Sequence, residues 1–405
     1  MKIAVAQLGN RMHYAVPEIL SKENILSTFY TDIYSKSLIR ILGNQFSNNL
    51  FSRLNNRRSL LLSDKKVVHY PIKGLNYKFE LSKVKNLRER FAVYNKINPQ
   101  FTQLVARDID WNSIDAVYVF NSAAKEIILK AKQKGKKVIL EQCIAPFALE
   151  QQIVSKEYDR YPDWNNTGFN EYLDCPEFKY FREREIEELN LADIILCPSP
   201  FVVESVSKFI SDTQKLKFVP YGVTFKNITT KKKKTAIEKP LNILTVGAGI
   251  RKGTQYILEA AKLLKGRAIF TLLGDLGTNN IEICNEVSKF INFKGHVPKN
   301  MVHQYYESAD IFLLPSLCEG SATVTYEAYN YGIPVIATLN TGALIDHGID
   351  GLIIESSSTE AIVNAIEYII INKKLEEFSN NALLKADLCS KQAYANRLIS
   401  TINNI

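Results

Sequence analysis

Two carboxylates flank a run of small residues in the stretch Pro315-Ser-Leu-Cys-Glu-Gly-Ser-Ala-Thr-Val-Thr-Tyr-Glu327. The stretch follows a predicted buried strand at 311–314, and its small residues open a predicted helix, where free N–H groups and the helix dipole attract phosphate. Glu327 lies eight residues after Glu319, a little over two helical turns, so the two carboxylates can share a side and accept paired sugar hydroxyls. The alternative is that Glu319 caps the helix and Glu327 faces solvent.

A second loop, Val246-Gly-Ala-Gly-Ile-Arg-Lys-Gly253, places two cations after another predicted strand. It is neither a Walker A loop nor a G-x-G-x-x-G fingerprint, because Lys252 precedes Gly253 and stands where the third glycine of the fingerprint would be. Arg251 and Lys252 would suit a diphosphate leaving group, whose charge develops as its bond breaks. The alternative is that both are surface cations beside a turn.

Strands that alternate with helices must position these loops. This pattern predicts an α/β fold of two tandem Rossmann-like, doubly wound parallel-sheet domains with a helical C-terminal tail, with ligands at the carboxyl ends of the strands. The predicted strands are 3–7, 67–72, 116–120, 137–141, 194–197 and 217–219, then 241–246, 268–273, 291–293, 311–314, 335–337 and 352–354.

The predicted domain organisation follows from the same pattern. We expect an N-terminal Rossmann-like domain at 1–225, a lysine-rich linker at 226–240 and a C-terminal Rossmann-like domain at 241–385. A last helix, 386–405, is expected to return to the N-terminal domain.

Length and composition agree with two globular domains. The chain has 405 residues, of which 46% are hydrophobic and 23% charged, which excludes collagen-like, largely disordered and disulfide-stapled classes. The net charge of +9 is uneven: residues 1–140 hold 24 basic and 10 acidic side chains, against 27 and 32 in the rest. The first third therefore predicts an anionic partner.

Several kinds of site have little support in the sequence. No apolar run approaches the roughly 20 residues of a membrane span, the N-terminus lacks the pattern of a signal peptide, and the six cysteines form no C-x-x-C pair. We therefore expect a cytoplasmic protein with free thiols and no metal. Asp108-Ile109-Asp110 has the form of a metal-binding D-x-D motif, but it follows a helical run rather than a strand.

The chain resembles the retaining family 4 (group 1) glycosyltransferases, which have the two-domain GT-B fold. The resemblance rests on the E-x7-E motif of Glu319 and Glu327 within PSLCEGSATVTYEAYNYGIPVIAT, on the loop VGAGIRKG and on the later DHGIDGLIIE. It covers about 241–355, while 1–225 fit the acceptor domain only by position.

The resemblance implies a UDP- or GDP-sugar donor and neither metal nor another cofactor. Lys252 and Arg251 would neutralise the diphosphate, Glu319 would hold the transferred sugar near its reacting carbon, and Glu327 would bind the ribose hydroxyls. The other donor-binding residues implied are Gly249, Gly274, Val297, Gly320, Ser321, Ala322 and Thr323. Two positions depart from the family: Ala248 stands where an arginine is frequent, so that Arg251 would substitute, and Glu141 stands near a common histidine position.

The acceptor side has weaker signals. Gly9, Arg11 and His13 lie in the first strand–loop–helix turn, and Asn121 and Glu141 lie at the ends of later strands, so we expect acceptor contacts there. For Glu141 the alternative is that it only ends its strand, and for His13 that it is structural.

Residues 36–62 form a basic amphipathic pattern that can lie on an anionic membrane or pack on the domain's own core. The first reading predicts peripheral contact with the inner face of the cell membrane.

Together these features predict a metal-independent glycosyltransferase. It would move a sugar from a nucleotide-diphosphate sugar to a glycan or lipid-linked acceptor hydroxyl in cell-surface polysaccharide or glycolipid synthesis. One alternative is a nucleotide-sugar epimerase of the same fold. The other is a basic nucleic-acid-binding protein, which would leave the motifs of the second domain unused; we expect no nucleic-acid partner.

Overall fold

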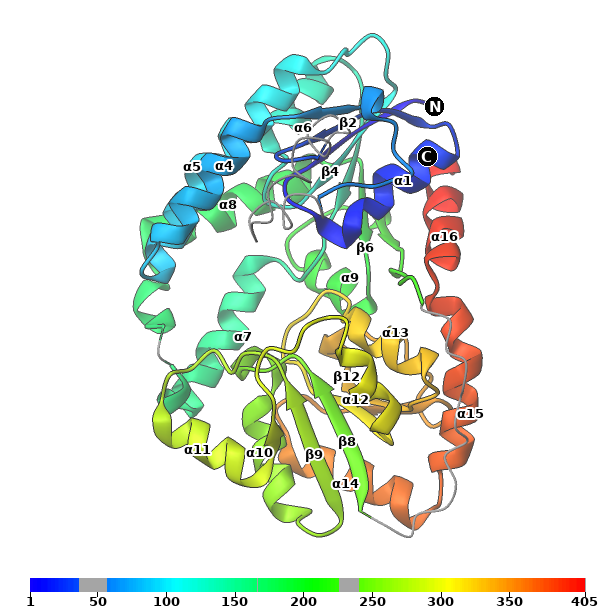
Figure 1. Ribbon diagram of the computed structural model, residues 1–405. Helices are drawn as coiled ribbons and strands as arrows, with labels where there is room; N and C mark the ends of the chain where they lie inside the picture. The colour runs from blue at the N-terminus through cyan, green and yellow to red at the C-terminus, as the bar shows by residue number, and fades with distance from the viewer. Residues whose placement is uncertain (36–56, 166, 226–239, 405) are drawn as a thin grey trace, which may run out of the picture. The chain divides into compact units, whose positions relative to one another are not determined.

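The computed structural model describes residues 1–35, 57–165, 167–225 and 240–404. These residues form two compact units (Figure 1). The first unit comprises Met1–Phe147, Glu171–Leu196 and Val206–Lys217, and the second comprises Ala148–Asn170, Cys197–Ser205 and Phe218–Ile405. Apart from its last residue, the predicted linker lies outside the described residues.

The first sheet has seven strands in the order β3-β2-β1-β4-β5-β6-β7, and the registers of its first six strands are parallel. The strands are β1 (Ile3–Gln7), β2 (Leu26–Thr31), β3 (Val67–His69), β4 (Ala116–Phe120), β5 (Lys137–Glu141), β6 (Ile194–Cys197) and β7 (Leu216–Phe218). All five residues of both β1 and β4 are buried, as expected for central strands of a covered parallel sheet.

Two details of this sheet differ from the predicted strands. The strand predicted at 67–72 ends at His69, because Pro71 occupies the first position of a helix, where its missing N–H and fixed φ are favourable. Strand β2 was not predicted, because Ser27 and Thr28 interrupt its apolar pattern; it lies between β1 and β3.

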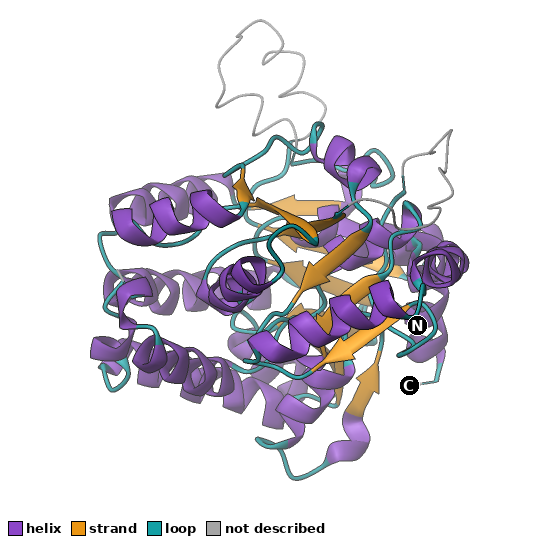
Figure 2. Cartoon of the chain, turned by 90° about the horizontal axis from the view of Figure 1, so that it is seen from below, coloured by secondary structure: helices purple, strands orange, loops and turns teal. Residues whose placement is uncertain are grey.

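Helices lie on either side of the strands (Figures 1 and 2). Those in the first half of the chain are α1 (Ala15–Lys22), α4 (Pro71–Lys83), α5 (Leu87–Asp108), α6 (Lys125–Gln133), α7 (Phe147–Arg160), α8 (Pro176–Leu191) and α9 (Pro200–Ser207). Helix α1 begins only at Ala15, because Met12, His13 and Tyr14 all have positive φ angles and form a left-handed turn before it.

The second sheet has six strands in the order β10-β9-β8-β11-β12-β13, all parallel. They are β8 (Leu241–Val246), β9 (Ala268–Leu273), β10 (Asn292–Phe293), β11 (Ile311–Leu314), β12 (Val335–Thr338) and β13 (Gly351–Ile354). Each agrees with its predicted range to within one residue. The helices between them are α10 (Thr254–Leu263), α11 (Ile281–Phe290), α12 (Val302–Ser308) and α13 (Thr323–Asn330).

The C-terminal tail is helical, as predicted: α14 (Thr359–Ile371), α15 (Leu375–Ala386) and α16 (Lys391–Asn403) follow the last strand. Helix α14 packs into the core of the second unit through Ile362, Ile366 and Ile369. From α16, the Arg397 guanidinium donates to the carbonyls of Pro220 and Tyr221 within the same unit. In the described part of the chain, no helix is long and apolar enough to cross a membrane.

Both sheets reverse their strand order beside a central strand, between β1 and β4 in the first and between β8 and β11 in the second. In doubly wound folds, ligands bind outside the carboxyl ends of the strands at such a reversal point. The two reversal points are therefore where functional side chains are expected.

Candidate functional site

The reversal point of the second sheet is formed by the loops that follow β8 and β11, which pair directly at Ile243 with Ile311. The loops contact each other closely: the Leu317 N–H donates to the Arg251 carbonyl at 2.9 Å. Gly253 has a φ of +76°, and a Cβ there would lie 2.3 Å from the Pro315 carbonyl oxygen. Only a glycine at position 253 lets the loop after β8 lie this close to the loop after β11. This close packing brings the two predicted motifs together.

Arg251, Lys252 and Glu319 form an ion cluster at this point. The Glu319 Oε1 atom lies 2.6 Å from Lys252 Nζ and 3.3 Å from Arg251 Nη1. On its other side, Arg251 Nε lies 3.8 Å from Glu150 Oε1 of α7. Glu319 does not cap the following helix, because the N-cap residue is Ala322 and no side chain caps it. The three residues predicted to act on the diphosphate and sugar thus lie together.

Backbone N–H groups at the start of α13 complete one side of this site. The N–H of Ala322 donates to the Thr341 carbonyl at 3.1 Å, so it is already used in this structure. Thr323 and Val324 lie in the first turn, where N–H groups have no acceptor within the helix. They are the donors of this segment best placed for a phosphate. The Ser321 hydroxyl lies 2.6 Å from that of Tyr326.

Glu327 lies deeper along α13 and is partly buried. Its Oε2 atom is 3.1 Å from the hydroxyl of Tyr306, a ring that is 2% exposed and stacks on Tyr331 with centroids 5.2 Å apart. Burial raises the pKa of the Glu327 carboxyl, while the Tyr306 hydrogen bond and the charge of Lys299 act in the opposite direction. The carboxylate is therefore held in a defined position and does not simply face solvent.

The other predicted donor-binding residues lie around the glycine loop. Gly274 follows β9, and a Cβ there would lie 2.9 Å from the Ala248 nitrogen, so its loop packs against the loop after β8. The Gly274 N–H donates to the Gly295 carbonyl at 2.8 Å, two residues before Val297. Gly249 donates its N–H to the Thr254 hydroxyl at 2.9 Å and so helps to start α10.

The reversal point of the first sheet opens into a cavity of about 390 Å³. Gly9 and Arg11 from the loop after β1 and Asn121 from the end of β4 line it together, as an acceptor-side grouping would require. The remaining lining residues are Leu8, Asp32, Arg57, Tyr77, Lys78, Leu81, Tyr94, Asn98, Phe120, Ser122, Ala123 and Phe181.

His13 and Glu141 are absent from the described lining of this cavity. The Glu141 side chain is 2% exposed and accepts a hydrogen bond from the Tyr118 hydroxyl, which holds it inside the sheet. Asn121 is fixed from behind, since its Nδ2 donates to Glu185 Oε1 at 3.0 Å and its Oδ1 accepts from the Cys143 N–H at 3.3 Å. Burial raises the pKa of the Glu185 carboxyl.

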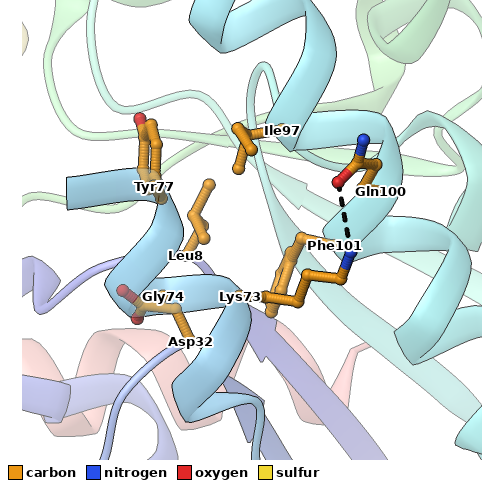
Figure 3. A pocket seen from close by; sticks show the side chains of 8 residues that line it. All are labelled: Leu8, Asp32, Lys73, Gly74, Tyr77, Ile97, Gln100 and Phe101. Carbon is orange, nitrogen blue, oxygen red and sulfur yellow. Dashed lines mark hydrogen bonds between the residues drawn. The ribbon is translucent and has the colours of Figure 1, made fainter. Parts of the chain in front are cut away.

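Sequence reasoning missed several of the charged and aromatic residues that line this cavity. Asp32 directly follows β2, the strand that was not predicted, and Lys78 and Tyr77 lie on α4, whose start was predicted as strand. Gly74 allows α4 to pack closely, since a Cβ there would lie 2.4 Å from Ile33 Cγ1. Figure 3 shows a smaller pocket that shares Asp32 and Tyr77 with this cavity. Gly74 of α4 lies beside Asp32 in it.

The D-x-D motif takes no part in these sites, and among its described residues the amphipathic segment contributes Arg57 to the cavity of the first unit. Asp108 pairs with Arg107 and accepts from the Tyr70 hydroxyl at 3.0 Å. In the ranges that the structure describes, no group of three or more His, Cys, Asp or Glu side chains is placed to hold a metal ion. Of the amphipathic segment 36–62, residues 36–56 lie outside the described ranges, and the described end, 57–62, is a turn rather than a helix.

Comparison with known proteins finds a match to a family model within the second unit. The family model described as "Glycosyl transferases group 1" matches residues 240–372, which contain both predicted donor motifs. An amylovoran biosynthesis glycosyltransferase of Erwinia amylovora is 29% identical over 153 residues, 32% of this chain and 36% of its own. A UDP-galactose:GlcNAc-diphosphoundecaprenol α-1,3-galactosyltransferase of Escherichia coli is 24% identical over 196 residues, 44% of this chain and 50% of its own. The chain thus spans half or less of the length of these relatives.

Solved structures extend the likeness to the whole chain. An Anabaena protein, HepE, in complex with UDP and glucose has a TM-score of 0.61 at 13% identity, with both chains fully covered. Sucrose-phosphate synthase of Thermosynechococcus elongatus has a TM-score of 0.64 at 14% identity, covering 100% of this chain and 98% of its own. At such identities the likeness shows the fold, which is GT-B. Residues 240–372 thus match the group 1 glycosyltransferase model, and the chain shares the GT-B fold of these solved structures.

Proposed function

We propose that the protein transfers a sugar from a nucleotide-diphosphate sugar to an acceptor hydroxyl, with retention of anomeric configuration. The observation that carries this proposal is the ion cluster of Arg251, Lys252 and Glu319 at the reversal point of the second sheet. It lies within the span that matches the family. The HepE structure that shares the fold holds UDP and glucose, which supports a UDP-sugar, with a GDP-sugar as the other donor to be tested.

Each residue of the cluster has a task that its position supports. Lys252 and Arg251 would hold the diphosphate and stabilise its charge as the bond to the sugar breaks. The N–H groups of Thr323 and Val324 would add helix-terminus donors to a phosphate. Glu319, freed from Lys252 by the incoming phosphate, would accept hydroxyls of the transferred sugar, and Glu327 would accept those of the ribose.

Positive charge for this chemistry comes from side chains and a helix end, so we propose that transfer needs no metal and no further cofactor. Activity is then expected to be unchanged in excess EDTA. A strong loss that Mg²⁺ or Mn²⁺ restores would contradict the metal-independent part of the proposal.

The acceptor is proposed to be a glycan or lipid-linked sugar in cell-surface polysaccharide or glycolipid synthesis. The two relatives described above act, by their names, in amylovoran biosynthesis and on a diphosphoundecaprenol-linked sugar. Gly9, Arg11 and Asn121 line the cavity proposed to receive it. His13 and Glu141 do not line this cavity, so contact with the acceptor would require that the acceptor extend beyond it.

We further propose a cytoplasmic protein with peripheral contact to the inner face of the cell membrane. Helix α4 supports this contact, since Ile72, Leu75 and Phe79 lie on one side of it and are 82%, 48% and 58% exposed. Lys83 Nζ lies 3.9 Å from the centre of the Phe79 ring, at the edge of this apolar stripe. Exposed apolar groups with adjacent cations are typical of surfaces that bind anionic lipid.

Sedimentation with vesicles tests the membrane contact. The protein should sediment with phosphatidylglycerol vesicles, and Phe79→Ser should reduce the bound fraction several-fold, whereas Leu263→Ser, an equally exposed apolar residue on α10, should not. Equal binding by the Phe79 variant and the unchanged protein would remove α4 from the proposal.

The central proposal is tested with a thermal-shift panel of nucleoside diphosphates and their sugars. A ligand that binds only the folded state raises apparent stability by mass action, so one base should raise the midpoint above all the others. The sugar that stabilises further then enters a transfer assay, with the product's anomeric configuration read by NMR. Turnover of the nucleotide sugar without any acceptor would instead favour the epimerase, and no response to any nucleotide would contradict the donor.

A further inference from the structure

The turn that follows β12 lies against the loop that carries Glu319. This turn, Leu339–Thr341, is a short 3-10 helix. Because β12 pairs in parallel with β11, with Ile336 opposite Leu313, the segments that follow the two strands leave the same edge of the sheet. The turn is therefore close to residues 315–322, which connect β11 to α13.

Two buried threonines hold the turn to this loop. The Thr338 hydroxyl donates to the Ser316 carbonyl at 2.5 Å. The Thr341 hydroxyl donates to the Leu314 carbonyl at 2.7 Å, and the Thr341 carbonyl accepts the Ala322 N–H at 3.1 Å. Since Thr338 is 2% exposed and Thr341 is 0% exposed, water has little access to these bonds. The turn is thus fixed relative to β11 and to the start of α13.

Asn340, the middle residue of the turn, holds the backbone on both sides of Cys318. Its Nδ2 donates to the Leu317 carbonyl at 2.8 Å. Its own carbonyl accepts the Glu319 N–H at 3.0 Å. Because a side chain starts from its own backbone, these two bonds fix the point from which the Glu319 carboxylate extends.

The same segment is also held from the glycine loop, and there the contacts depend on cations. Arg251 Nη1 donates to the Cys318 carbonyl at 2.9 Å and lies 3.3 Å from Glu319 Oε1. Lys252 Nζ lies 2.6 Å from the same carboxylate oxygen. A diphosphate that draws these cations toward itself weakens both contacts. The hydrogen bonds of Asn340 involve no charged group, so a phosphate does not compete for them.

We propose that Asn340 is a positioning residue that keeps Glu319 in place while a bound donor occupies the two cations. This inference rests on the proposed transfer function, because Asn340 acts only through Glu319 and the sugar that Glu319 would bind. A nucleoside diphosphate has no sugar for Glu319, so Asn340 should matter little to its binding. A nucleotide sugar and its transfer should depend on Asn340 much more.

The test compares a nucleoside diphosphate with its nucleotide sugar, the pair being the one that the thermal-shift panel selects from the UDP- and GDP-sugars. Asn340→Ala removes the amide and keeps the backbone bond to Glu319. Calorimetry should give an affinity for the nucleoside diphosphate close to that of the unchanged protein. The additional affinity that the sugar brings should fall about fivefold, the effect of one hydrogen bond. The kcat of transfer should fall about tenfold, less than the roughly 100-fold cost of a 1 Å misplacement.

Asn381→Ala is the matched control. Asn381 of α15 lies in the same unit and outside both donor motifs, and its Nδ2 donates to the Ile349 carbonyl at 2.9 Å. It therefore loses the same kind of hydrogen bond, and it should keep both affinities and full turnover. Asn340→Gln retains an amide on a longer side chain and should recover part of the lost kcat. Far-UV circular dichroism confirms that each variant is folded.

The inference is overturned if Asn340→Ala keeps full turnover and sugar affinity, or if it weakens binding of the nucleoside diphosphate as much as that of the nucleotide sugar. The proposed function is read separately, from the unchanged protein: absence of nucleotide binding there would contradict the donor site. If the nucleotide sugar binds without transfer, the transferase is contradicted and the two affinities still decide the role of Asn340. An active unchanged protein beside an equally active Asn340→Ala variant would contradict only this inference.

Discussion

The two sheets repeat one strand order, and each gathers side chains at the point where that order reverses, but the charges gathered there differ. In the second unit, two cations, Arg251 and Lys252, lie against two carboxylates, Glu319 and Glu150. In the first unit, the described lining of the cavity has three cations and one carboxylate. Carboxylates therefore match the cations in number in the second unit, whereas the described lining of the first unit's cavity has more cations than carboxylates.

This difference indicates how an anion would enter each site. At the proposed donor site, a diphosphate would have to take the cations from Glu319, and the displaced carboxylate would then be available to sugar hydroxyls. At the cavity of the first unit, an anion would meet more lining cations than carboxylates. Substitutions that change the balance in one unit should leave the other unit unaffected.

The largest effect is expected from Lys252→Ala. Removing the Nζ atom that lies 2.6 Å from Glu319 removes a charge that would stabilise the departing diphosphate, so turnover should fall roughly 100- to 1,000-fold. Steady-state transfer with the donor identified by the thermal-shift panel measures this.

Lys265→Ala, at an exposed position just beyond α10, is the matched control and should keep full turnover. Near-normal turnover of the Lys252 variant would mean that the cation of the glycine loop does not act on the leaving group.

That Arg251, Lys252 and Glu319 lie together could be predicted from the sequence because the parts of this cluster are local. Two short motifs, each at the end of an apolar strand, supply Arg251, Lys252 and Glu319, and the buried strands β8 and β11 were predicted at their observed bounds. The same local reasoning could not decide whether Glu327 faces solvent, because Tyr306, which positions it, comes from α12, 21 residues earlier.

The acceptor cavity could be predicted only in part because its lining comes from distant segments. Gly9, Arg11 and Asn121 follow strands with clear apolar patterns. Asp32 follows β2, whose polar Ser27 and Thr28 obscured the strand. Arg57, Lys78 and Phe181 reach the cavity only through tertiary packing, for which no short motif exists.

The second-largest effect is expected from Glu319→Gln, which changes the balance of charge between Glu319 and the two cations. Glu319→Gln removes the carboxylate that competes with phosphate for Lys252, so the affinity for the nucleoside diphosphate should rise about tenfold. Turnover should fall in the same variant, because the amide is a weaker acceptor for the transferred sugar. Calorimetry and transfer rates read the two effects separately.

Glu150→Gln serves as the graded control, since Glu150 lies 3.8 Å from Arg251 and should change affinity much less. If Glu319→Gln leaves nucleotide affinity unchanged or weaker, the donor site is not balanced by that carboxylate, and the contrast with the acceptor cavity fails.

A smaller effect is expected from pH, through Glu327. Burial raises the pKa of this carboxyl above its ordinary value, so as pH falls from neutrality the group gains a proton earlier than an exposed glutamate would. The protonated form is a poorer acceptor for ribose hydroxyls, and nucleotide-sugar affinity should therefore decline as pH falls through the raised pKa. Nucleotide sugars suit this titration because their esterified diphosphate does not titrate near neutrality.

Glu327→Gln should bind the nucleotide sugar severalfold more weakly at neutral pH and lose that part of the pH dependence. A variant that keeps the decline of the unchanged protein would assign it to another group.

The smallest effect is expected from Tyr306→Phe, which removes a single hydroxyl within the second unit. That hydroxyl lies 3.1 Å from both Glu327 Oε2 and the Val324 carbonyl, while the ring stays fixed by its stacking on Tyr331 and Phe312. Without it Glu327 loses one positioning hydrogen bond, worth about 1 kcal/mol, so nucleotide affinity should fall about fivefold. The hydrogen bond lowers the pKa of Glu327, so its removal should also move the pH-dependent decline to higher pH. A stability defect alone would weaken affinity without moving that decline.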